Sequence, residues 1–224
     1  MLLALDTSTE RIGVALYDGT RVVAECAWQG GRRHTRQLAP LIHEVLSRVG
    51  ASMDEVSGIA VALGPGSFTG LRIGLAFAKG LAVGRGLPLL GVPTLDAVAA
   101  AVPPTSAFPT LAAVLPAGRG RLAVGWYRLN EGTWQPRQAP EILTADTLAQ
   151  RIHNPTVVCG ELQAEERRRL ARKYRRVWLP SPATCARRPA YVAELAWQRL
   201  QAGESDHPAT LTPIYLHTGT PIPA

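Results

Sequence analysis

The chain has few cysteines, and none of them lies in a metal-binding pattern. Cys26, Cys159 and Cys185 are far apart in the sequence, and no Cys-x-x-Cys pair occurs. This spacing argues against a zinc knuckle and a disulfide framework, and it favours a reducing, cytoplasmic setting. The histidines are also scattered: His34 and His43 are nine residues apart, which does not place them on one helix face as a ligand pair. The sequence therefore predicts no metal site.

Long hydrophobic runs are missing as well. Proline, arginine or aspartate interrupts every apolar stretch before it is long enough to span a bilayer. The segment Met1–Asp6 has no basic start and is too short for a signal peptide, so we expect no membrane partner. Hydrophobic residues make up 46% and charged residues 18% of the 224 residues, a globular composition that suits one large domain or two small ones.

Acidic residues are outnumbered by basic ones, and the formal net charge is +7. The basic residues are densest in the run Arg167–Arg176. Two interpretations of this run stay open. A solvated helix face is the commoner origin of a charge run, whereas contact with the phosphates of a nucleic acid would use the same charge.

The most informative segment is Gly64–Gly74, with the sequence Gly-Pro-Gly-Ser-Phe-Thr-Gly-Leu-Arg-Ile-Gly. It follows the strand-like run Ile59–Leu63 and leads into the helix-like run Leu71–Val83. A turn of this kind exposes backbone N–H groups at a helix N-terminus, where the helix dipole favours an anion. Ser67 is predicted to cap the helix.

Small residues recur at every fourth position of the predicted helix: Gly70, Gly74, Ala78 and Ala82. Glycine inside a helix costs about 1 kcal/mol relative to alanine, so this stripe needs a structural reason. The reason we infer is the close approach of another helix. That helix belongs either to this chain or to a second subunit, and both alternatives stay open.

The hydrophobic pattern predicts two copies of one order of elements. Asp18-Gly19 gives a hairpin signal between the second and third strands. Hairpins that lead into helix-linked strands imply a mixed sheet with helices on its faces. We therefore predict an α/β protein with a duplicated ribonuclease-H-like (actin-like) fold. The proline-rich stretch Pro103–Pro109 is the expected boundary between subdomains 1–102 and 103–224, and the C-terminal tail is expected to pack back on the first.

The first half is predicted to hold strands at 2–6, 12–17, 21–28, 57–63 and 88–92, and helices at 35–49, 71–83 and 94–102. The second half is predicted to hold strands at 110–115, 121–129, 156–159 and 176–179, and helices at 144–152, 162–173 and 189–201. Another strand, broken by Pro136 and Pro140, is expected to end near Leu143.

Asp6-Thr7-Ser8-Thr9 ends the first predicted strand. In actin-like folds an aspartate followed by small hydroxyl residues at this place approaches phosphate and magnesium, and hydroxyl and backbone N–H donors suit that contact. The alternative is a polar turn whose side chains satisfy its own loop. No catalytic residue is assigned, because Gly66-Ser67-Phe68 lacks the G-x-S-x-G elbow and Lys79 lies too far along the helix for a phosphate-loop lysine.

The Gly64–Gly74 stretch closely resembles the signature of the bacterial TsaB (YeaZ) family. The first hundred residues carry nearly all of the resemblance. Further segments similar to the family are Leu3–Thr9, His34-Thr35 followed by Leu38, Pro40 and Leu41, Gly91–Leu95, and the Pro-x-Tyr-Leu ending Pro213–Leu216.

The resemblance implies an actin-like fold of two subdomains and a role in tRNA modification. TsaB proteins bind the catalytic paralogue TsaD and, with the ATPase TsaE, support threonylcarbamoylation of the adenosine beside the anticodon in tRNAs that read codons beginning with A. The expected partners are therefore TsaD, TsaE and, through the complex, tRNA; alone, the chain is expected to form a homodimer. No cofactor of its own is expected, and ATP or ADP would bind either at Asp6–Thr9 or at the interface with TsaD.

An accessory role is also what the differences from TsaD imply. TsaD carries a His-x-x-x-His metal pair just after its fifth strand, whereas Val92–Val98 contains no histidine. The alternative is a stand-alone actin-like enzyme, either a small-molecule kinase or a metal-dependent peptidase or transferase. Pro116 counts against a kinase, because it stands where an aspartate is expected. The hairpin Pro116–Ala123 departs from the family pattern Asp-Ala-Arg-x-Gly-Glu-Val-Tyr.

We expect the glycine-striped helix to supply the interface with TsaD. Its small residues should pack against the matching TsaD helix, with Leu71, Phe77 and Leu81 adding apolar area. On this hypothesis Gly74→Leu abolishes partner binding while the chain stays folded. The predicted interface residues are Gly70, Arg72, Gly74, Phe77, Ala78 and Ala82.

Overall fold

The computed structural model describes residues 1–31 and 33–216. The chain forms two compact units. The first unit consists of Met1–Ala97 and Arg188–Ile214, and the second of Val98–Arg187 together with the chain from Tyr215. Within the described ranges, no helix combines the length and the hydropathy that crossing a membrane requires.

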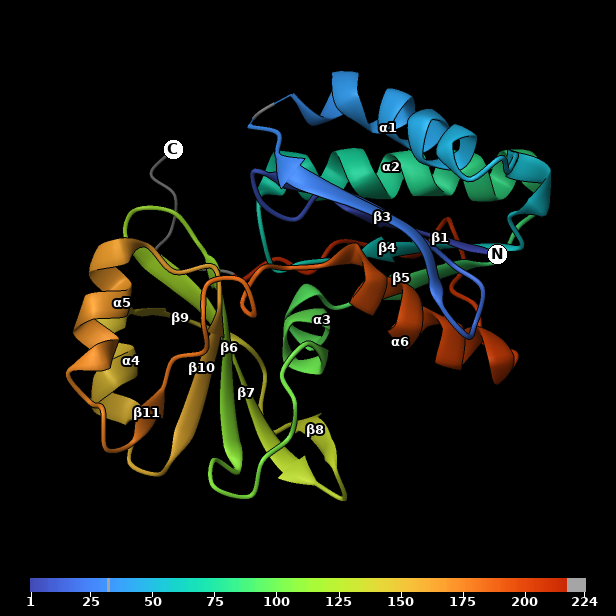
Figure 1. Cartoon of the computed structure of the whole chain (residues 1–224). Coiled ribbons are helices and arrows are strands. Elements are labelled where there is room, and N and C mark those ends of the chain that lie inside the picture. Colours follow the sequence, from blue (N-terminus) through green and yellow to red (C-terminus); the bar gives the residue numbers. More distant parts are fainter. Residues whose placement is uncertain (32, 217–224) are drawn as a thin grey trace. The chain divides into compact units, whose positions relative to one another are not determined.

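The first unit is built on a five-stranded mixed sheet with the order β3-β2-β1-β4-β5 (Figure 1). The antiparallel pairs are β1–β2 and β2–β3, and the parallel pairs are β1–β4 and β4–β5. Asp18 closes the β2–β3 hairpin, since its carboxylate accepts hydrogen bonds from the backbone N–H groups of Thr20 and Arg21. The strands are β1 (Leu2–Asp6), β2 (Arg11–Tyr17), β3 (Val22–Gln29), β4 (Gly58–Ala62) and β5 (Leu89–Val92).

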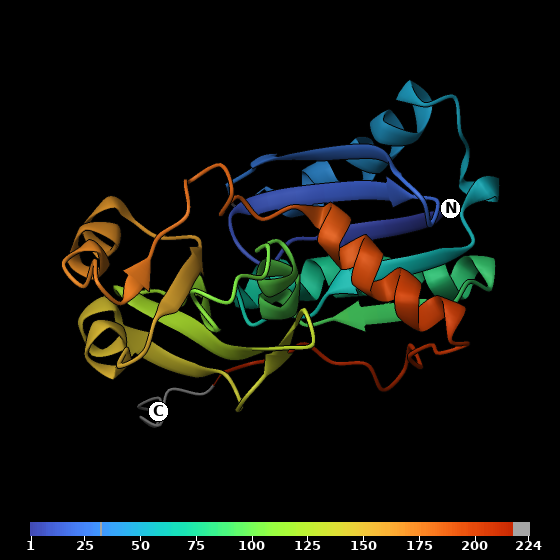
Figure 2. The same ribbon diagram turned by 60° about the horizontal axis from the view of Figure 1, so that its bottom comes forward.

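Helices cover both faces of this sheet. On one face, α1 (His34–Arg48) and α2 (Phe68–Arg85) pack over the side chains of Leu3 and Leu5. On the other, α6 (Pro189–Gln201) lies across the sheet (Figure 2), and its side chains pack with those of Leu2 and Ala4. Successive β1 side chains alternate between the two faces, so all five residues of this strand are buried.

The second unit repeats the plan with the strand order β11-β10-β6-β7-β8, and β9 also pairs with β7. Two helices, α4 (Ala145–Arg151) and α5 (Ala164–Ala171), cover one face of its sheet, and α3 (Thr94–Ala100) lies where the chain passes from the first unit to the second. The strands are β6 (Thr110–Pro116), β7 (Arg121–Asn130), β8 (Thr133–Pro136), β9 (Glu141–Thr144), β10 (Thr156–Gly160) and β11 (Val177–Trp178).

The two sheets share one topology. In each, the first strand is central, a hairpin strand lies antiparallel on one side of it, and two later strands lie parallel on the other. This arrangement confirms the predicted duplicated ribonuclease-H-like fold. The predicted strand with two prolines is instead two separate strands, β8 and β9, because Pro136 ends one ladder before Glu141 begins the next.

The units do not follow the predicted division into 1–102 and 103–224. The chain leaves the first unit after Ala97 and returns to it at Arg188, so α6 belongs to the first sheet. Apolar packing explains this return, since Val192 and Ala193 are fully buried in the cluster that contains Leu2. Glu25 on β3 also accepts hydrogen bonds from the Ala190 backbone N–H and the Arg188 guanidinium.

The segment after α6 runs back along β5. Asp206 is its anchor: its backbone N–H donates to Leu89 O at 2.7 Å, and its carboxylate accepts from the Gly91 N–H at 2.7 Å and from Arg199 Nη2 at 3.0 Å. Further along, the Ile214 N–H donates to Leu63 O at 2.8 Å. Partial burial raises the pKa of the Asp206 carboxyl, but the bonds from Arg199 and Gly91 outweigh it and hold that pKa below its usual range.

Asp206→Asn is expected to lower the free energy of unfolding by about 1–2 kcal/mol at pH 7, since charge-assisted hydrogen bonds are lost from a partly exposed pair. The folded-state pKa lies below the unfolded one, so the stabilisation is complete above the unfolded pKa and disappears as pH falls through the folded pKa. Urea unfolding of the parent chain and of the Asp206→Asn variant from pH 6 to pH 3 measures this loss of stabilisation.

The matched control is Asp54→Asn, which removes an exposed ion pair with Arg85 and should change the free energy of unfolding by less than about 0.5 kcal/mol. A difference between the Asp206 variant and the parent chain that stays constant down to pH 3 would contradict the assignment.

Candidate functional site

The glycine-rich segment forms the connection between β4 and α2. Ser67 caps α2, as predicted: its backbone is extended and its hydroxyl accepts a hydrogen bond from the Gly70 N–H at 3.3 Å. The Leu71 N–H donates to Ser67 O at 2.9 Å. The first bond satisfies a backbone donor of the first turn that a helix otherwise leaves unpaired, and the second is the first regular bond of the helix.

The loop Asp6–Thr9 lies directly against this segment and is buried. The Thr7 hydroxyl donates to Gly70 O at 2.8 Å, and the Ser67 N–H donates to Ser8 O at 2.6 Å. Asp6 turns back on its own loop, because its carboxylate accepts from the Ser8 N–H at 2.9 Å. Several polar groups of Asp6–Thr9 are therefore hydrogen-bonded within the chain, as the polar-turn interpretation expects. Phosphate contact at these residues stays a prediction.

Thr94 joins the two loops from the start of α3. Its hydroxyl lies 2.8 Å from the Ser8 hydroxyl and accepts from the Gly64 N–H at 2.9 Å, while its own N–H donates to Gly64 O at 2.8 Å. The sequence pattern places Thr94 only at the start of the helix predicted at 94–102. No local pattern indicates the clamp, because its partners lie 30 and 86 residues away.

His34 fixes α1 to the same loop. Its side chain is buried, and its Nε2 lies 2.9 Å from Thr9 O, where the ring nitrogen acts as the donor to the carbonyl. The histidine at the helix start is therefore a packing residue that connects α1 to the end of β1. Across residues 1–31 and 33–216, no three His, Cys, Asp or Glu side chains gather as a metal-binding group.

The small-residue stripe of α2 faces inward. Gly70, Gly74, Ala78 and Ala82 are all buried. A Cβ atom at Gly70 would lie 2.2 Å from Thr7 O, and one at Gly74 would lie 2.2 Å from Thr7 Oγ1. The prediction that this stripe docks a second subunit is therefore wrong, and a leucine at Gly74 would have to displace the Thr7 side chain. The close neighbour is this chain's own β1 loop.

The outward face of α2 carries a second set of small residues. Ala76, Gly80 and Gly84 are exposed, and a Cβ at either glycine would have no neighbour within 4 Å. They lie two positions after members of the buried stripe, which places them on the opposite side of the helix. Two large apolar side chains of α2 are also exposed, Phe68 at 57% and Val83 at 69%.

Of the six predicted interface residues, only Arg72 is exposed on the outer surface of α2. Its guanidinium lies over the Phe68 ring at 5.1 Å from the centroid. Phe77 is half-buried and packs against the core beneath α1 and α2. Figure 1 shows α1 and α2 side by side on this face of the first sheet.

Two cysteines that are distant in sequence meet in the second unit. Cys159 and Cys185 are free and buried, with their Sγ atoms 3.2 Å apart. The hydrogen bond between them raises the pKa of the Cys159 thiol and lowers that of Cys185. The pair holds the segment before α6 against β10.

Comparison with known proteins places the chain among tRNA-modification proteins. The family model TsaD, described as tRNA N6-adenosine threonylcarbamoyltransferase, matches residues 25–182. The chain is 33% identical over 155 residues to the tRNA threonylcarbamoyladenosine biosynthesis protein TsaB of Escherichia coli (strain K12). That match covers 67% of this chain and 65% of the relative, slightly less than two thirds of its length.

Solved structures show the same relationship over more of the chain. YeaZ from Pseudomonas aeruginosa is 26% identical with a TM-score of 0.75, and the match covers 96% of this chain and 99% of that one. The ROK hexokinase from Thermus thermophilus is 12% identical with a TM-score of 0.50, covering 90% of this chain and 99% of the hexokinase. The latter similarity shows the shared fold alone.

Gly74→Ala is expected to destabilise the chain by about 1–3 kcal/mol, because the added methyl group collides with Thr7 Oγ1. Gly80→Ala is the matched control on the same helix. It has free space and should raise the free energy of unfolding by up to about 1 kcal/mol. Urea unfolding measures both, and equal effects of the two substitutions would refute the buried placement of the stripe.

Proposed function

The chain belongs to the TsaB (YeaZ) family, and we propose that it is a non-catalytic scaffold subunit for threonylcarbamoylation of the adenosine next to the anticodon of tRNA. In this proposal it binds a TsaD-type transferase and a TsaE-type ATPase. The E. coli relative is a tRNA threonylcarbamoyladenosine biosynthesis protein, which supports the pathway. The observation that carries the scaffold role is the exposed, partly apolar outer face of α2.

This face has the properties of a helix-docking surface. Ala76, Gly80 and Gly84 expose little side chain, so another helix can approach the backbone closely. Phe68 and Val83 add apolar area on the same helix, and Arg72 adds a charge. We propose that a helix of TsaD lies on this surface. In the absence of TsaD, a second copy of the chain would cover the same face in a two-fold dimer.

The contacts around Asp6–Thr9 support a role without chemistry in this chain. Thr94 stands within the segment where TsaD carries its histidine pair, and its hydroxyl is used to join Ser8 to Gly64. The loop residues Thr7 and Ser8 are bonded to the α2 segment in the same way. In this proposal ATP or ADP binds at the interface with TsaD rather than being turned over by this chain.

Ala76→Arg is expected to weaken co-purification with the cognate TsaD at least tenfold, about 1.4 kcal/mol, because a long charged side chain separates the two helices. The site is exposed, so the thermal unfolding midpoint should not change. Ala171→Arg, at an exposed alanine at the end of α5, is the control and should leave TsaD binding intact.

Unchanged TsaD binding by the Ala76 variant would place the interface elsewhere. The stand-alone enzyme is tested on the purified chain: ATP hydrolysis, or metal content near one ion per chain, would favour that alternative over the scaffold.

A further inference from the structure

We propose that the second unit carries a binding pocket for a nucleoside phosphate, and that its occupant is one nucleotide of a single-stranded RNA. The pocket lies at the end of the sheet where β6 begins at Thr110 and β10 begins at Thr156. Its volume is about 360 Å³, within the range of about 300–1,000 Å³ typical of small-molecule sites. The choice of RNA as the source of the nucleotide rests on the proposed role in tRNA modification.

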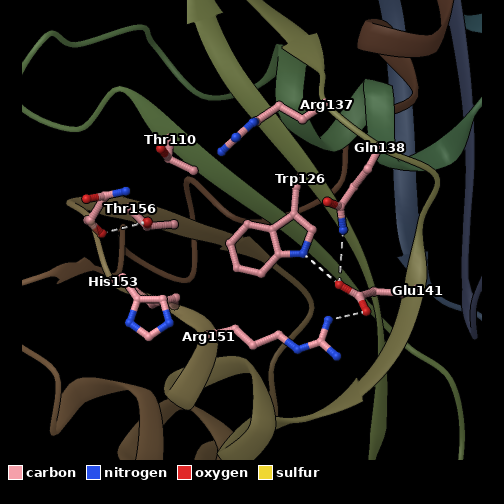
Figure 3. A pocket seen from close by; sticks show the side chains of 10 residues that line it. Thr110, Trp126, Arg137, Gln138, Glu141, Arg151, His153 and Thr156 are labelled. Carbon is pink, nitrogen blue, oxygen red and sulfur yellow. Dashed lines mark hydrogen bonds and ion pairs between the residues drawn. The ribbon is translucent and has the colours of Figure 1, made fainter.

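An indole ring forms the centre of the pocket (Figure 3). Side chains of β7 alternate between faces, and Leu122 and Val124 on one face are buried beneath α4 and α5. Trp126 continues this face and is only half-buried, so its ring lines the pocket. Aromatic rings stack nucleobases favourably and with little sequence preference.

The ring is held in a fixed orientation by Glu141. Trp126 Nε1 donates to Glu141 Oε1 at 3.0 Å, and Gln138 Nε2 donates to the same oxygen at 3.3 Å. The other carboxylate oxygen is ion-paired with Arg151. The negative charge of Glu141 is therefore compensated, and this residue positions the ring rather than repelling an anion.

Two further guanidinium groups supply positive charge beside the ring. Arg137 is exposed, and its backbone N–H donates to Trp126 O at 2.8 Å, which places it next to the indole. Arg128 is opposite Thr110 in the β6–β7 register, and it lines an adjoining cavity of about 240 Å³ together with Arg137. Within the described residues, neither guanidinium is hydrogen-bonded or ion-paired. Arginine in this state is well suited to bind phosphate.

The basic run at Arg167–Arg176 continues this surface. Its first part is used internally: Arg167 donates to Leu179 O at 3.2 Å, and Arg168 and Arg169 pair with Glu165. Its second part, residues 172–176, is exposed and includes Tyr174 at 72%.

This exposed part lies at the pocket's end of the sheet. The Thr156 N–H donates to Arg176 O at 2.7 Å, and Thr156 pairs with Val177 across β10 and β11. An RNA strand whose base occupies the pocket can therefore continue along positive charge, which favours a nucleotide within a strand over a free one.

The test measures binding of a fluorescent eight-nucleotide oligoadenylate to the purified chain without TsaD. Arg137→Gln should weaken binding about fivefold or more and reduce the slope of log affinity against log salt by about one. Arg119→Gln is the matched control, because it removes an exposed arginine of the same unit at the opposite end of β6 and should change neither quantity. Trp126→Leu should also weaken binding, with its folding checked by circular dichroism.

Three outcomes would overturn the proposal: equal effects of the Arg137 and Arg119 substitutions, competition by polyglutamate as effective as competition by RNA, or binding of AMP at least as tight as that of the octamer. The last result would assign the pocket to a free nucleotide. Because TsaD is absent from this assay, loss of RNA binding and loss of TsaD binding by the Ala76 variant are separate failures.

Discussion

The close approach of α2 to the β1 loop is the constraint on which the first unit depends. A Cβ atom at Gly66, Gly70 or Gly74 would lie 2.1–2.2 Å from an oxygen of Ser8 or Thr7. Only glycine lets the helix come this near, and the Thr7 hydroxyl uses the proximity to bond Gly70 O. The contact determines the rotation of α2 about its axis. Once the glycine face lies against the loop, the opposite face must point away from the sheet.

Periodicity along the sequence identified the small face of α2 but could not say what covers it. Gly70, Gly74, Ala78 and Ala82 recur every fourth residue, and so do Ala76, Gly80 and Gly84 on the other side. Both stripes satisfy the same spacing rule, and only the position of Thr7 distinguishes them. The order of strands and helices along the chain, by contrast, was predictable, because hairpin signals and alternating apolar positions are local. Even α6, predicted at 189–201, begins and ends as expected, although its sheet was assigned wrongly.

In the second unit, likewise, the sequence shows where basic residues cluster but not which of them form ion pairs. The run Arg167–Arg176 gives a single signal in the sequence, but the fold divides it into paired and exposed parts. Asp146, which pairs with Arg169, lies on α4, 23 residues earlier. The pocket around Trp126 is even harder to predict from the sequence, since its lining residues come from separate strands and loops. No local motif connects Thr110, Glu141 and His153. The parallel alignment of β6 and β10 brings the segments of Thr110 and His153 together, and the antiparallel pairing of β7 with β6 and β9 adds that of Glu141.

The duplicated fold thus has the same topology twice with different residues at corresponding places. At the end of β1, Asp6 is followed by hydroxyl residues that join the strand to α2 and α3. At the end of β6, the corresponding central strand, Pro116 stands instead and offers neither a carboxylate nor a backbone N–H. An enzyme that binds a nucleotide between two equivalent loops needs polar groups from both halves to hold it. The proposed scaffold role has no such requirement, and the two halves carry different features: small outward-facing residues on α2 in the first, and the arginine-lined pocket around Trp126 in the second.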